Sequence, residues 1–166
     1  TSQSGFLSTP YNSVVAAGTE VREVLPDSRF RNAFHLRARH LLLDDFAIEP
    51  GVGAYFDDWG ARAFNLELAL WWEMFPKTLI VRPSYRYHTQ TEVDDYLSDT
   101  ATVIPEFRTQ DSDLADFDSH TVGIKFIFPH ARFFGDDHEF EFGVDYTMRS
   151  DDLDSMSFTF GYQWRF

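Results

Sequence analysis

The sequence predicts an all-β fold, an antiparallel transmembrane β-barrel, on three observations. Aromatic residues make up 17% of the 166 residues and include 18 Phe, although the mean hydropathy is negative at −0.32. No stretch approaches the roughly 18 unbroken apolar residues that a membrane-spanning helix needs. From residue 29 onward, segments of about ten residues alternate apolar and polar side chains, which is the length and period of tilted membrane strands.

Seven segments carry this alternation. They are predicted at residues 29–42, 47–56, 63–73, 79–88, 121–128, 139–149 and 156–166. In the first, Phe34 and Leu36 stand at even positions, whereas Arg37 and Arg39 stand at odd positions. A soluble antiparallel sheet with one face on a core also alternates. We favour the barrel because every segment alternates and none has a helical period.

The alternation assigns one face of each segment to lipid and the other to the lumen. The outward positions expected to be accessible in the protein alone include Leu66, Leu68, Leu70, Phe126, Phe142, Val144, Phe158 and Phe160. The charged positions assigned to the lumen are Arg31, His35, Arg37, Arg39, Glu67, Arg82, Arg86, Lys125, Glu139, Glu141 and Asp145. Charge facing lipid is costly, so these residues have no other favourable face.

Opposite charges on neighbouring strands can pair across the sheet. For the hairpin through Phe75 and Pro76, both apolar faces stay in lipid only if paired residue numbers sum to an odd value. A sum near 151 places Glu67 opposite Ser84. The predicted pairs support two interpretations. The charges fill a small lumen as salt bridges, or the arginines line a wider pore that selects anions.

The strand number decides between these interpretations. Seven is odd, whereas single-chain bacterial barrels normally have an even number of strands. One alternative is that residues 12–24 supply an eighth strand. Its outward residues are then Val15, Ala17, Thr19 and Val21. The other alternative, which we favour, treats residues 1–28 as an external segment and residues 29–166 as the C-terminal strands of a larger barrel.

The links between the segments alternate in character. Those at 43–46, 74–77 and 129–137 are short, and those at 57–61, 89–120 and 150–155 are long or acidic. Outer-membrane barrels have short periplasmic turns and longer external loops. Trp71, Trp72 and Phe75 gather at one predicted periplasmic turn, and Trp164 lies near the C-terminus, as expected of an aromatic girdle at an interface.

The last strand carries the most specific pattern in the chain. Aromatic side chains occupy alternate positions at Phe158, Phe160, Tyr162, Trp164 and Phe166. This pattern resembles the C-terminal assembly signal of bacterial outer-membrane proteins, which the barrel-assembly machinery reads. Such a strand offers an unpaired edge, which soluble proteins normally suppress.

Acidic residues are dense in the link after residue 89. Asp111, Asp113, Asp116 and Asp118 are candidate ligands for Ca²⁺, which prefers carboxylate oxygens. The segment lacks the glycine and terminal Glu of an EF-hand loop. We therefore favour a solvated acidic external loop and predict neither a metal nor a cofactor.

Carboxylates and imidazoles are also predicted near the external rim. Asp57, Asp58, His88, Asp118 and His120 loosely resemble the groups with which some outer-membrane proteases activate water. Their spacing is not diagnostic, and no His-Glu-x-x-His motif occurs. The sequence therefore predicts no enzyme and no catalytic residue.

Several segments match a known family. They are Gly5-Phe-Leu-Ser-Thr-Pro-Tyr-Asn-Ser-Val14, Pro26-Asp-Ser-Arg29, Arg37-Ala-Arg-His40, Tyr55-Phe-Asp-Asp-Trp-Gly60, Tyr85-Arg-Tyr-His-Thr-Gln90 and Ser119-His-Thr121. In these segments the chain resembles an uncharacterised outer-membrane barrel family known as domain of unknown function 3570. The resemblance implies that the chain corresponds to the C-terminal part of members about twice as long or longer. It implies the fold and no activity.

These observations predict an outer-membrane protein that is a passive, porin-like pore or a structural component of an outer-membrane assembly. A barrel that binds an external or periplasmic partner protein through its loops is the alternative, and a rim-located hydrolase is the least favoured. The expected partners are the lipid bilayer, lipopolysaccharide, the barrel-assembly machinery and other subunits of such an assembly. A net charge of −13 argues against nucleic acid, whose phosphates require Lys and Arg.

Overall fold

A computed structural model describes residues 13–97, 101–129 and 138–164 of the chain. In chain order the strands are β1 (Ser13–Ala16), β2 (Thr19–Arg22), β3 (Arg31–Arg37), β4 (His40–Leu43), β5 (Phe46–Asp57), β6 (Arg62–Phe75), β7 (Leu79–Gln90), β8 (Phe117–Phe128), β9 (His138–Arg149) and β10 (Ser155–Trp164). A 3-10 helix, η1 (Ser112–Leu114), precedes β8. Over the described ranges, no helix combines the length and the apolar character needed to cross a bilayer.

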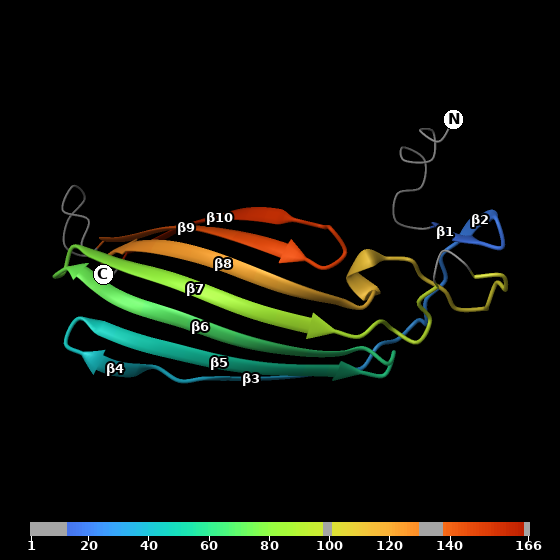
Figure 1. Cartoon of the computed structure of the whole chain (residues 1–166), viewed down its shortest axis with the longest axis horizontal. Coiled ribbons are helices and arrows are strands. Elements are labelled where there is room, and N and C mark those ends of the chain that lie inside the picture. Colours follow the sequence, from blue (N-terminus) through green and yellow to red (C-terminus); the bar gives the residue numbers. More distant parts are fainter. Residues whose placement is uncertain (1–12, 98–100, 130–137, 165–166) are drawn as a thin grey trace, which may run out of the picture. The chain divides into compact units, whose positions relative to one another are not determined.

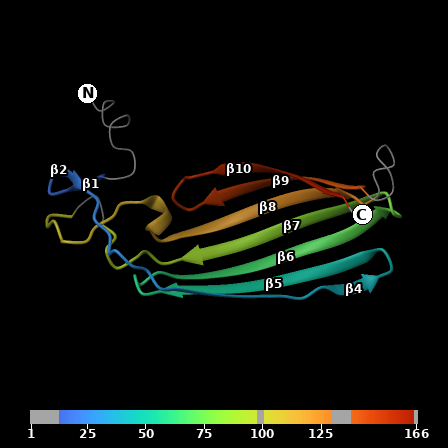
Figure 2. The same ribbon diagram turned by 180° about the vertical axis from the view of Figure 1, so that it is seen from behind.

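The long strands form one antiparallel sheet, which confirms the predicted fold class. Its order is β10-β9-β8-β7-β6-β5-β3, with β4 also paired to β5. Figures 1 and 2 show this sheet from opposite sides as a curled half-barrel. Within the described ranges no ladder joins β3 to β10, so the sheet has two open edges.

The seven predicted segments are all strands, but the first is interrupted. It divides into β3 and β4, and the amide of Ala38 in the gap donates a hydrogen bond to the carbonyl of Pro50 at 3.1 Å. The ladder between β4 and β5 also shifts register between Leu41 and Leu43. Pro50 has no amide hydrogen to donate to a ladder, which accounts for irregular pairing at this point.

Residues 13–22 do not form an eighth strand of the large sheet, which was one alternative from the sequence. They fold back as the hairpin β1–β2, a separate two-stranded sheet in which Ala16 pairs with Thr19. Ala17 and Gly18 connect the two strands with φ angles of 51° and 73°. Both angles lie in the left-handed region, which gives the tight turn of a two-residue hairpin. The turn prevents this segment from continuing as one strand, so the single-strand alternative is wrong.

The register of β8, β9 and β10 keeps like side chains in rows across the sheet. Two successive apolar rows are Ile124, Val144, Phe158 and Phe126, Phe142, Phe160, and the row between them is Lys125, Gly143, Thr159. All eight residues that the sequence assigns to the outer face are at least partly exposed, from intermediate for Val144 to 73% for Phe160. This prediction is confirmed, and the polar rows lie on the opposite face.

In the hairpin between β6 and β7, paired residue numbers have an odd sum, as predicted, but the sum differs from the predicted value. Its turn closes with a hydrogen bond from the amide of Thr78 to the carbonyl of Phe75, and the amide of Thr91 bonds the carbonyl of Arg62 at the other end. Both pairs of residue numbers sum to 153, so the odd sum is confirmed and the value of 151 is wrong by two. The difference arises because the turn is centred on Pro76 and Lys77, one residue further along the chain than expected, with Lys77 at a left-handed φ of 56°.

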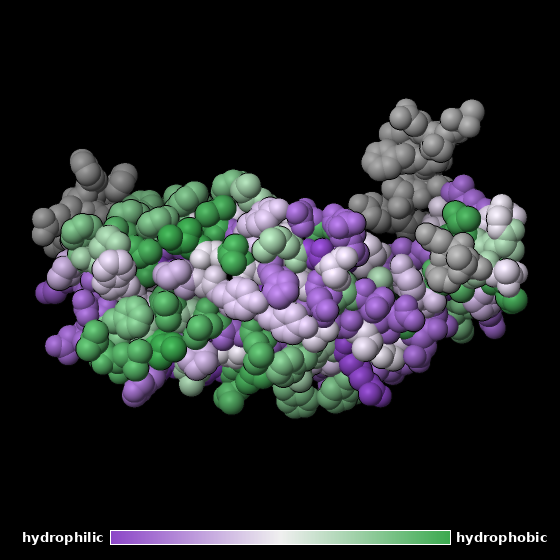
Figure 3. Space-filling model, viewed as in Figure 1, coloured by the Kyte–Doolittle hydropathy of each residue, from purple (hydrophilic) through white to green (hydrophobic). Residues whose placement is uncertain are grey.

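The chain divides into two compact units. Unit 1 comprises residues 1–33, 55–63 and 90–117, and unit 2 comprises residues 34–54, 64–89 and 118–166. Unit 1 has a small buried core that includes Val14, Ala16, Val93 and Ala115. Unit 2 buries mainly small or inward-facing side chains, and hydrophobic residues gather over its strands on the face shown in Figure 3.

Candidate functional site

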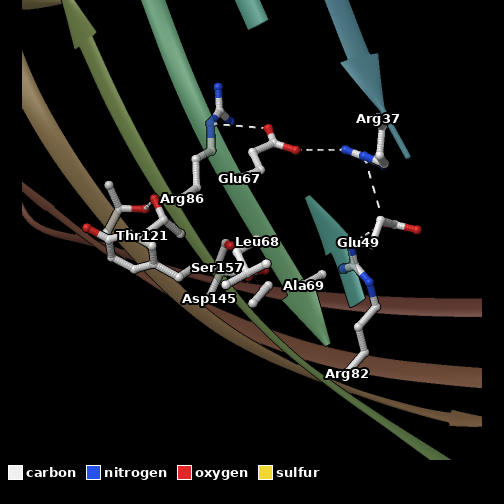
Figure 4. A pocket seen from close by; sticks show the side chains of 13 residues that line it. Arg37, Glu49, Glu67, Leu68, Ala69, Arg82, Arg86, Thr121, Asp145 and Ser157 are labelled. Atoms are coloured by element: carbon white, nitrogen blue, oxygen red, sulfur yellow. Dashed lines mark hydrogen bonds and ion pairs between the residues drawn. The ribbon is translucent and has the colours of Figure 1, made fainter. Parts of the chain in front are cut away.

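The polar face of the sheet in unit 2 surrounds a hollow of about 360 Å³. Its polar lining residues are Arg37, Glu49, Glu67, Arg82, Ser84, Arg86, Thr121, Asp145, Thr147 and Ser157. They come from all seven neighbouring strands, β3 and β5 to β10, so the sheet curves around the hollow with its polar face inside. Figure 4 shows the arrangement.

Glu49 on β5 is the centre of one group of ion pairs. Its carboxylate is 5% exposed and lies 2.6 Å from Nη2 of Arg39, 3.2 Å from Nη2 of Arg82 and 3.8 Å from Nε of Arg37. A buried carboxylate is tolerated when charged donors satisfy its oxygens. Three strands thus meet at one side chain.

Glu67 on β6 forms the second group. Its carboxylate lies 2.9 Å from Nη2 of Arg37, 3.6 Å from Nε of Arg86 and 3.6 Å from Nε2 of His35. Figure 4 shows that Arg37 joins the two groups, because its guanidinium contacts both Glu67 and Glu49. The result is a continuous charged network across β3, β5, β6 and β7.

Trp71 belongs to this network and not to an outer girdle, which corrects its predicted place. The guanidinium of Arg39 lies 3.7 Å from the centre of its indole ring, and that of Arg82 lies 5.0 Å from it. Trp71 has an odd number, as has Glu67 on the same strand, so both side chains lie on the inner face. The neighbouring Trp72 has the opposite orientation and is 44% exposed.

The network carries more positive than negative charge. Four arginines at positions 37, 39, 82 and 86 share two carboxylates, which leaves an excess of two positive charges in this network. On the wall formed by β8 and β9, Lys125 pairs with Glu141 at 3.3 Å, and Asp145 reaches the hollow. Glu139 and Glu141 line a second hollow of about 220 Å³. Arg31 is exposed at the start of β3.

Glu49 stands at an odd position of the predicted segment 47–56, so the alternation places it on the inner face, but its role was not recognised from the sequence. The nearest inward positions of that strand are Ala47, Gly51 and Gly53, so Glu49 is the single acid that β5 offers to the arginines of unit 2. This isolation was the signal. Trp71 offered no comparable signal, because alternation alone does not show that a ring stacks on guanidinium groups.

Two of the predicted rim carboxylates organise a loop in unit 1. Asp57 is fully buried, pairs with Arg29, and accepts hydrogen bonds from Tyr55 Oη at 2.6 Å and from the amides of Trp59 and Ala61, both at 3.0 Å. Asp58 accepts a hydrogen bond from the amide of Phe30 at 2.8 Å. These contacts fix the link between β5 and β6 to the segment that enters β3.

Two further rim candidates lie together in unit 2, on the outer face of the sheet. Tyr85 Oη is 2.7 Å from Nδ1 of His120, and Tyr87 Oη donates a hydrogen bond to Asp118 at 3.1 Å. His120 pairs across the sheet with Met148. Both have even numbers, as have the residues of the apolar rows on these strands, so both lie on the outer face. The fifth candidate, His88, lies near the end of β7 with its Nδ1 buried.

The candidate calcium ligands are used locally. Asp111 precedes η1 and accepts a hydrogen bond from the amide of Asp113 at 3.0 Å, so it caps the helix. Asp116 is exposed, and Asp118 contacts Tyr87. In the part of the chain that the structure describes, no group of three or more His, Cys, Asp or Glu side chains is placed to hold a metal ion.

The link between β9 and β10 contains a paired carboxylate. Asp151 lies 2.7 Å from Nη2 and 3.0 Å from Nε of Arg149, a bidentate arrangement. Burial alone would raise the pKa of the Asp151 carboxyl. The hydrogen bond from Arg149 and its positive charge outweigh this effect, so the pKa lies below its ordinary value. The carboxylate therefore stays ionised near neutral pH.

A curled antiparallel sheet with a polar inner face and an apolar outer face defines a protein of the β-barrel class. The chain belongs to the family described as "Protein of unknown function (DUF3570)", whose family model matches residues 1–166. This match confirms the resemblance seen in the sequence. No curated protein matches the chain. The description of the family names no activity, so the function is argued from the geometry.

Proposed function

We propose that the protein is a β-barrel of the bacterial outer membrane and acts as a passive pore for small solutes with a preference for anions. The observation that carries the proposal is the combination of an apolar band outside the sheet with a charged hollow inside it. A soluble sheet has its apolar face on a core, whereas the large side chains of unit 2 are exposed on the outer face.

Aromatic residues with polar groups bound the apolar band at both ends of the strands. Tyr85, Tyr87 and His120 lie at the end that leads to the link at 91–116. At the other end the His138 ring stacks on those of Tyr162 and Trp164, with ring centres 5.9 and 6.0 Å apart. Such residues gather at membrane interfaces because one part of the side chain is apolar and the other part is polar and hydrated.

The separation of these two girdles fits a bilayer. Met148 lies in the row of His120, and His138 lies at the other end of the same strand. Ten residues separate them, which at a rise of about 3.4 Å per residue and a tilt of about 40° span about 26 Å across the membrane. Apolar bands of outer-membrane barrels are about 25 Å tall.

The charged hollow supports permeation with a preference for anions. Arginines exceed carboxylates on the wall formed by β3 to β7, and Arg37 and Arg86 are 47% and 50% exposed. Fixed charges along a water-filled path set ion selectivity. The longer links then lie outside the cell, in contact with lipopolysaccharide, and the final strand serves the barrel-assembly machinery. Other subunits of an outer-membrane assembly are further partners in this proposal.

A planar-bilayer experiment on the intact membrane protein tests the pore. We expect a reversal potential across a salt gradient that shows anion preference, and a loss of that preference in the double variant Arg82→Glu with Arg86→Glu. The control is Arg22→Glu with Arg62→Glu, which reverses the same charge at exposed positions of unit 1. Absence of any conductance would overturn the pore, and an unchanged preference would overturn the role of the inner arginines.

A partner-binding barrel is the second candidate, because unit 1 is more ordered than a solvated loop requires. Gln110 accepts a hydrogen bond from the amide of Val15 and donates one to its carbonyl, at 2.7 and 3.0 Å. The amide and carbonyl of Val24 bond those of Arg108. If the protein does not conduct, and removal of hairpin β1–β2 abolishes binding of an external protein to cells, this candidate replaces the pore.

A further inference from the structure

We infer that glycines on the inner face make the lumen selective for small anions, because they let neighbouring carboxylates lie low on the sheet while guanidinium groups stand above them. The inference rests on the proposed pore and names the residues that set its selectivity. Counting charges alone does not give this result, since acids and bases are both present on the inner face. The depth at which each charged group lies decides which charge a solute meets.

The first observation is the space beside each glycine. Gly123 on β8 lies directly opposite Asp145 on β9, and a β-carbon on Gly123 would overlap the Asp145 carboxylate. Gly161 on β10 lies opposite Glu141, and a β-carbon there would overlap the Glu141 side chain. The carboxylate side chains therefore occupy the volume that a side chain on the next strand would otherwise fill.

At the centre of the charged network the carboxylates are less exposed than the arginines. Gly51 leaves more room here than Gly123 and Gly161 do, because a β-carbon on Gly51 would lie at an ordinary van der Waals distance of 3.4 Å from Oε2 of Glu67. Glu67 is 22% exposed, and Glu49 is 5% exposed. The guanidinium-bearing side chains of Arg37 and Arg86 are about twice as exposed as Glu67, at 47% and 50%. The accessible surface of the network is therefore mainly cationic.

The ligand class follows from the donors that remain accessible. Guanidinium groups present several N–H donors in a plane and match carboxylate or phosphate oxygens. In this hollow Glu49 and Glu67 are already engaged by arginines, and Arg37 and Arg86 still face the open space, whereas Asp145 lies beside Gly123. A small inorganic anion or a small carboxylate is thus attracted to the hollow, and a cation meets few exposed acids.

The decisive variant is Gly123→Ala, with Gly53→Ala as its matched control. The added methyl group displaces the far end of Asp145 from the sheet toward the hollow. Gly53 has the same relation to Asn65, whose amide a β-carbon would also overlap, so Gly53→Ala makes the same steric change against an uncharged side chain, which donates a hydrogen bond to Glu67 at 3.1 Å. A unit charge brought to within about 8 Å of a permeating ion in a water-like medium changes its partition about twofold.

The effect has opposite signs for an anion and a cation, so we expect the anion-to-cation permeability ratio, measured from reversal potentials in sodium chloride, to fall by up to about fourfold in Gly123→Ala and to stay unchanged in Gly53→Ala. The double variant Gly123→Ala with Asp145→Asn should return the ratio to at least that of the wild type, because it removes the displaced negative charge. If Gly123→Ala does not fold, Asp145→Glu replaces it. This substitution retains the glycine and extends the acid by one methylene, so we expect the same fall.

The outcomes separate this inference from the proposed function. A protein that conducts, but whose ratio is the same in Gly123→Ala and Asp145→Glu as in the wild type, overturns the role of the glycines and leaves the pore in place. An equal fall in Gly53→Ala also overturns it, because the effect would then be steric. A wild-type protein that does not conduct overturns the pore itself.

Discussion

Single residues in this chain show how the same charged groups serve different purposes in the two units. Asp57 in unit 1 is fully buried, and its oxygens are used by Arg29, by the Tyr55 hydroxyl and by two backbone amides. The Arg29 guanidinium also lies 4.5 Å from the centre of the Trp59 ring. Glu49 in unit 2 is almost as buried, but two of its three arginine partners, Arg37 and Arg82, line an open hollow. The first carboxylate holds a loop, and the second holds a charged surface.

Removal of Arg29 should destabilise unit 1 strongly. Arg29→Ala leaves the buried Asp57 carboxylate without its charged partner, a change that typically costs about 3–5 kcal/mol. We expect faster proteolysis of the segment before β3 and a lower unfolding midpoint for the purified protein. Arg31→Ala, at an exposed position two residues away, serves as the control and should change both little. Equal effects of the two substitutions would show that the Arg29–Asp57 pair does not hold the loop.

At the scale of strands, alternation in the sequence was sufficient to locate every long strand and its two faces. Period two is a property of the strand backbone, so it survives in any sheet with unlike faces. What the alternation could not supply was pairing. The interruption at Ala38 depends on Pro50 in the next strand, and the register of β6 with β7 depends on the left-handed conformation of Lys77.

The same limit explains what was missed in the candidate site. The inner arginines and Glu67 were found because they occupy the polar positions of segments that alternate between apolar and polar side chains. That Glu49 collects three of these arginines depends on which strands are neighbours, and that Trp71 stacks on Arg39 depends on the exact register. The hairpin β1–β2 was missed because Ala17 carries little turn preference, and a non-glycine residue rarely adopts a positive φ.

An arginine on the outer face of β9 should be much less tolerated than one on the inner face of the same sheet. Phe142 lies in the middle of the apolar rows, and Phe142→Arg should cost about 2–4 kcal/mol if these rows face the bilayer midplane. Thr159→Arg lies on the inner face, opposite Gly143, and is the control. Urea unfolding in lipid vesicles measures both. Similar costs for the two variants would contradict the assignment of the faces.

For the molecule as a whole, the exposure of apolar side chains rises toward the edges of the large sheet. Phe158 and Phe160 on β10 are 69% and 73% exposed, whereas Phe142 on the adjacent β9 is 44% exposed. Phe34 and Leu36 on β3 are 64% and 69% exposed. Long apolar strands with free edges are avoided in proteins that remain in water, because they template pairing with other chains. Both edges therefore have the properties expected of strands that pair with further strands.

The backbone amides of β10 should accordingly be protected in the membrane. We expect hydrogen exchange of the intact protein in lipid to be as slow for β10 as for β8, which has neighbours on both sides in the described sheet. Amides on a free edge exchange rapidly. Rapid exchange confined to β10 would show that this edge stays open in the bilayer and would contradict a closed barrel.

Assembly in cells should depend on the C-terminal residue, which lies outside the described part of the chain. Deletion of Phe166 should lower the amount of protein inserted in the outer membrane and leave the unfolding midpoint of the inserted fraction nearly unchanged, because the residue ends the last predicted strand. The control is Gln163→Lys, which alters the same strand outside its aromatic positions. Normal insertion of the truncated protein would contradict an assembly signal.

The order of the strands also sets the direction in which the barrel can close. Neighbouring strands alternate in direction along a run of seven, so β3 and β10 point the same way (Figure 1). A direct seam between them would be parallel, and two copies related by rotation about the barrel axis would meet at parallel seams as well. An antiparallel seam at each edge therefore requires an odd number of strands in addition to this sheet.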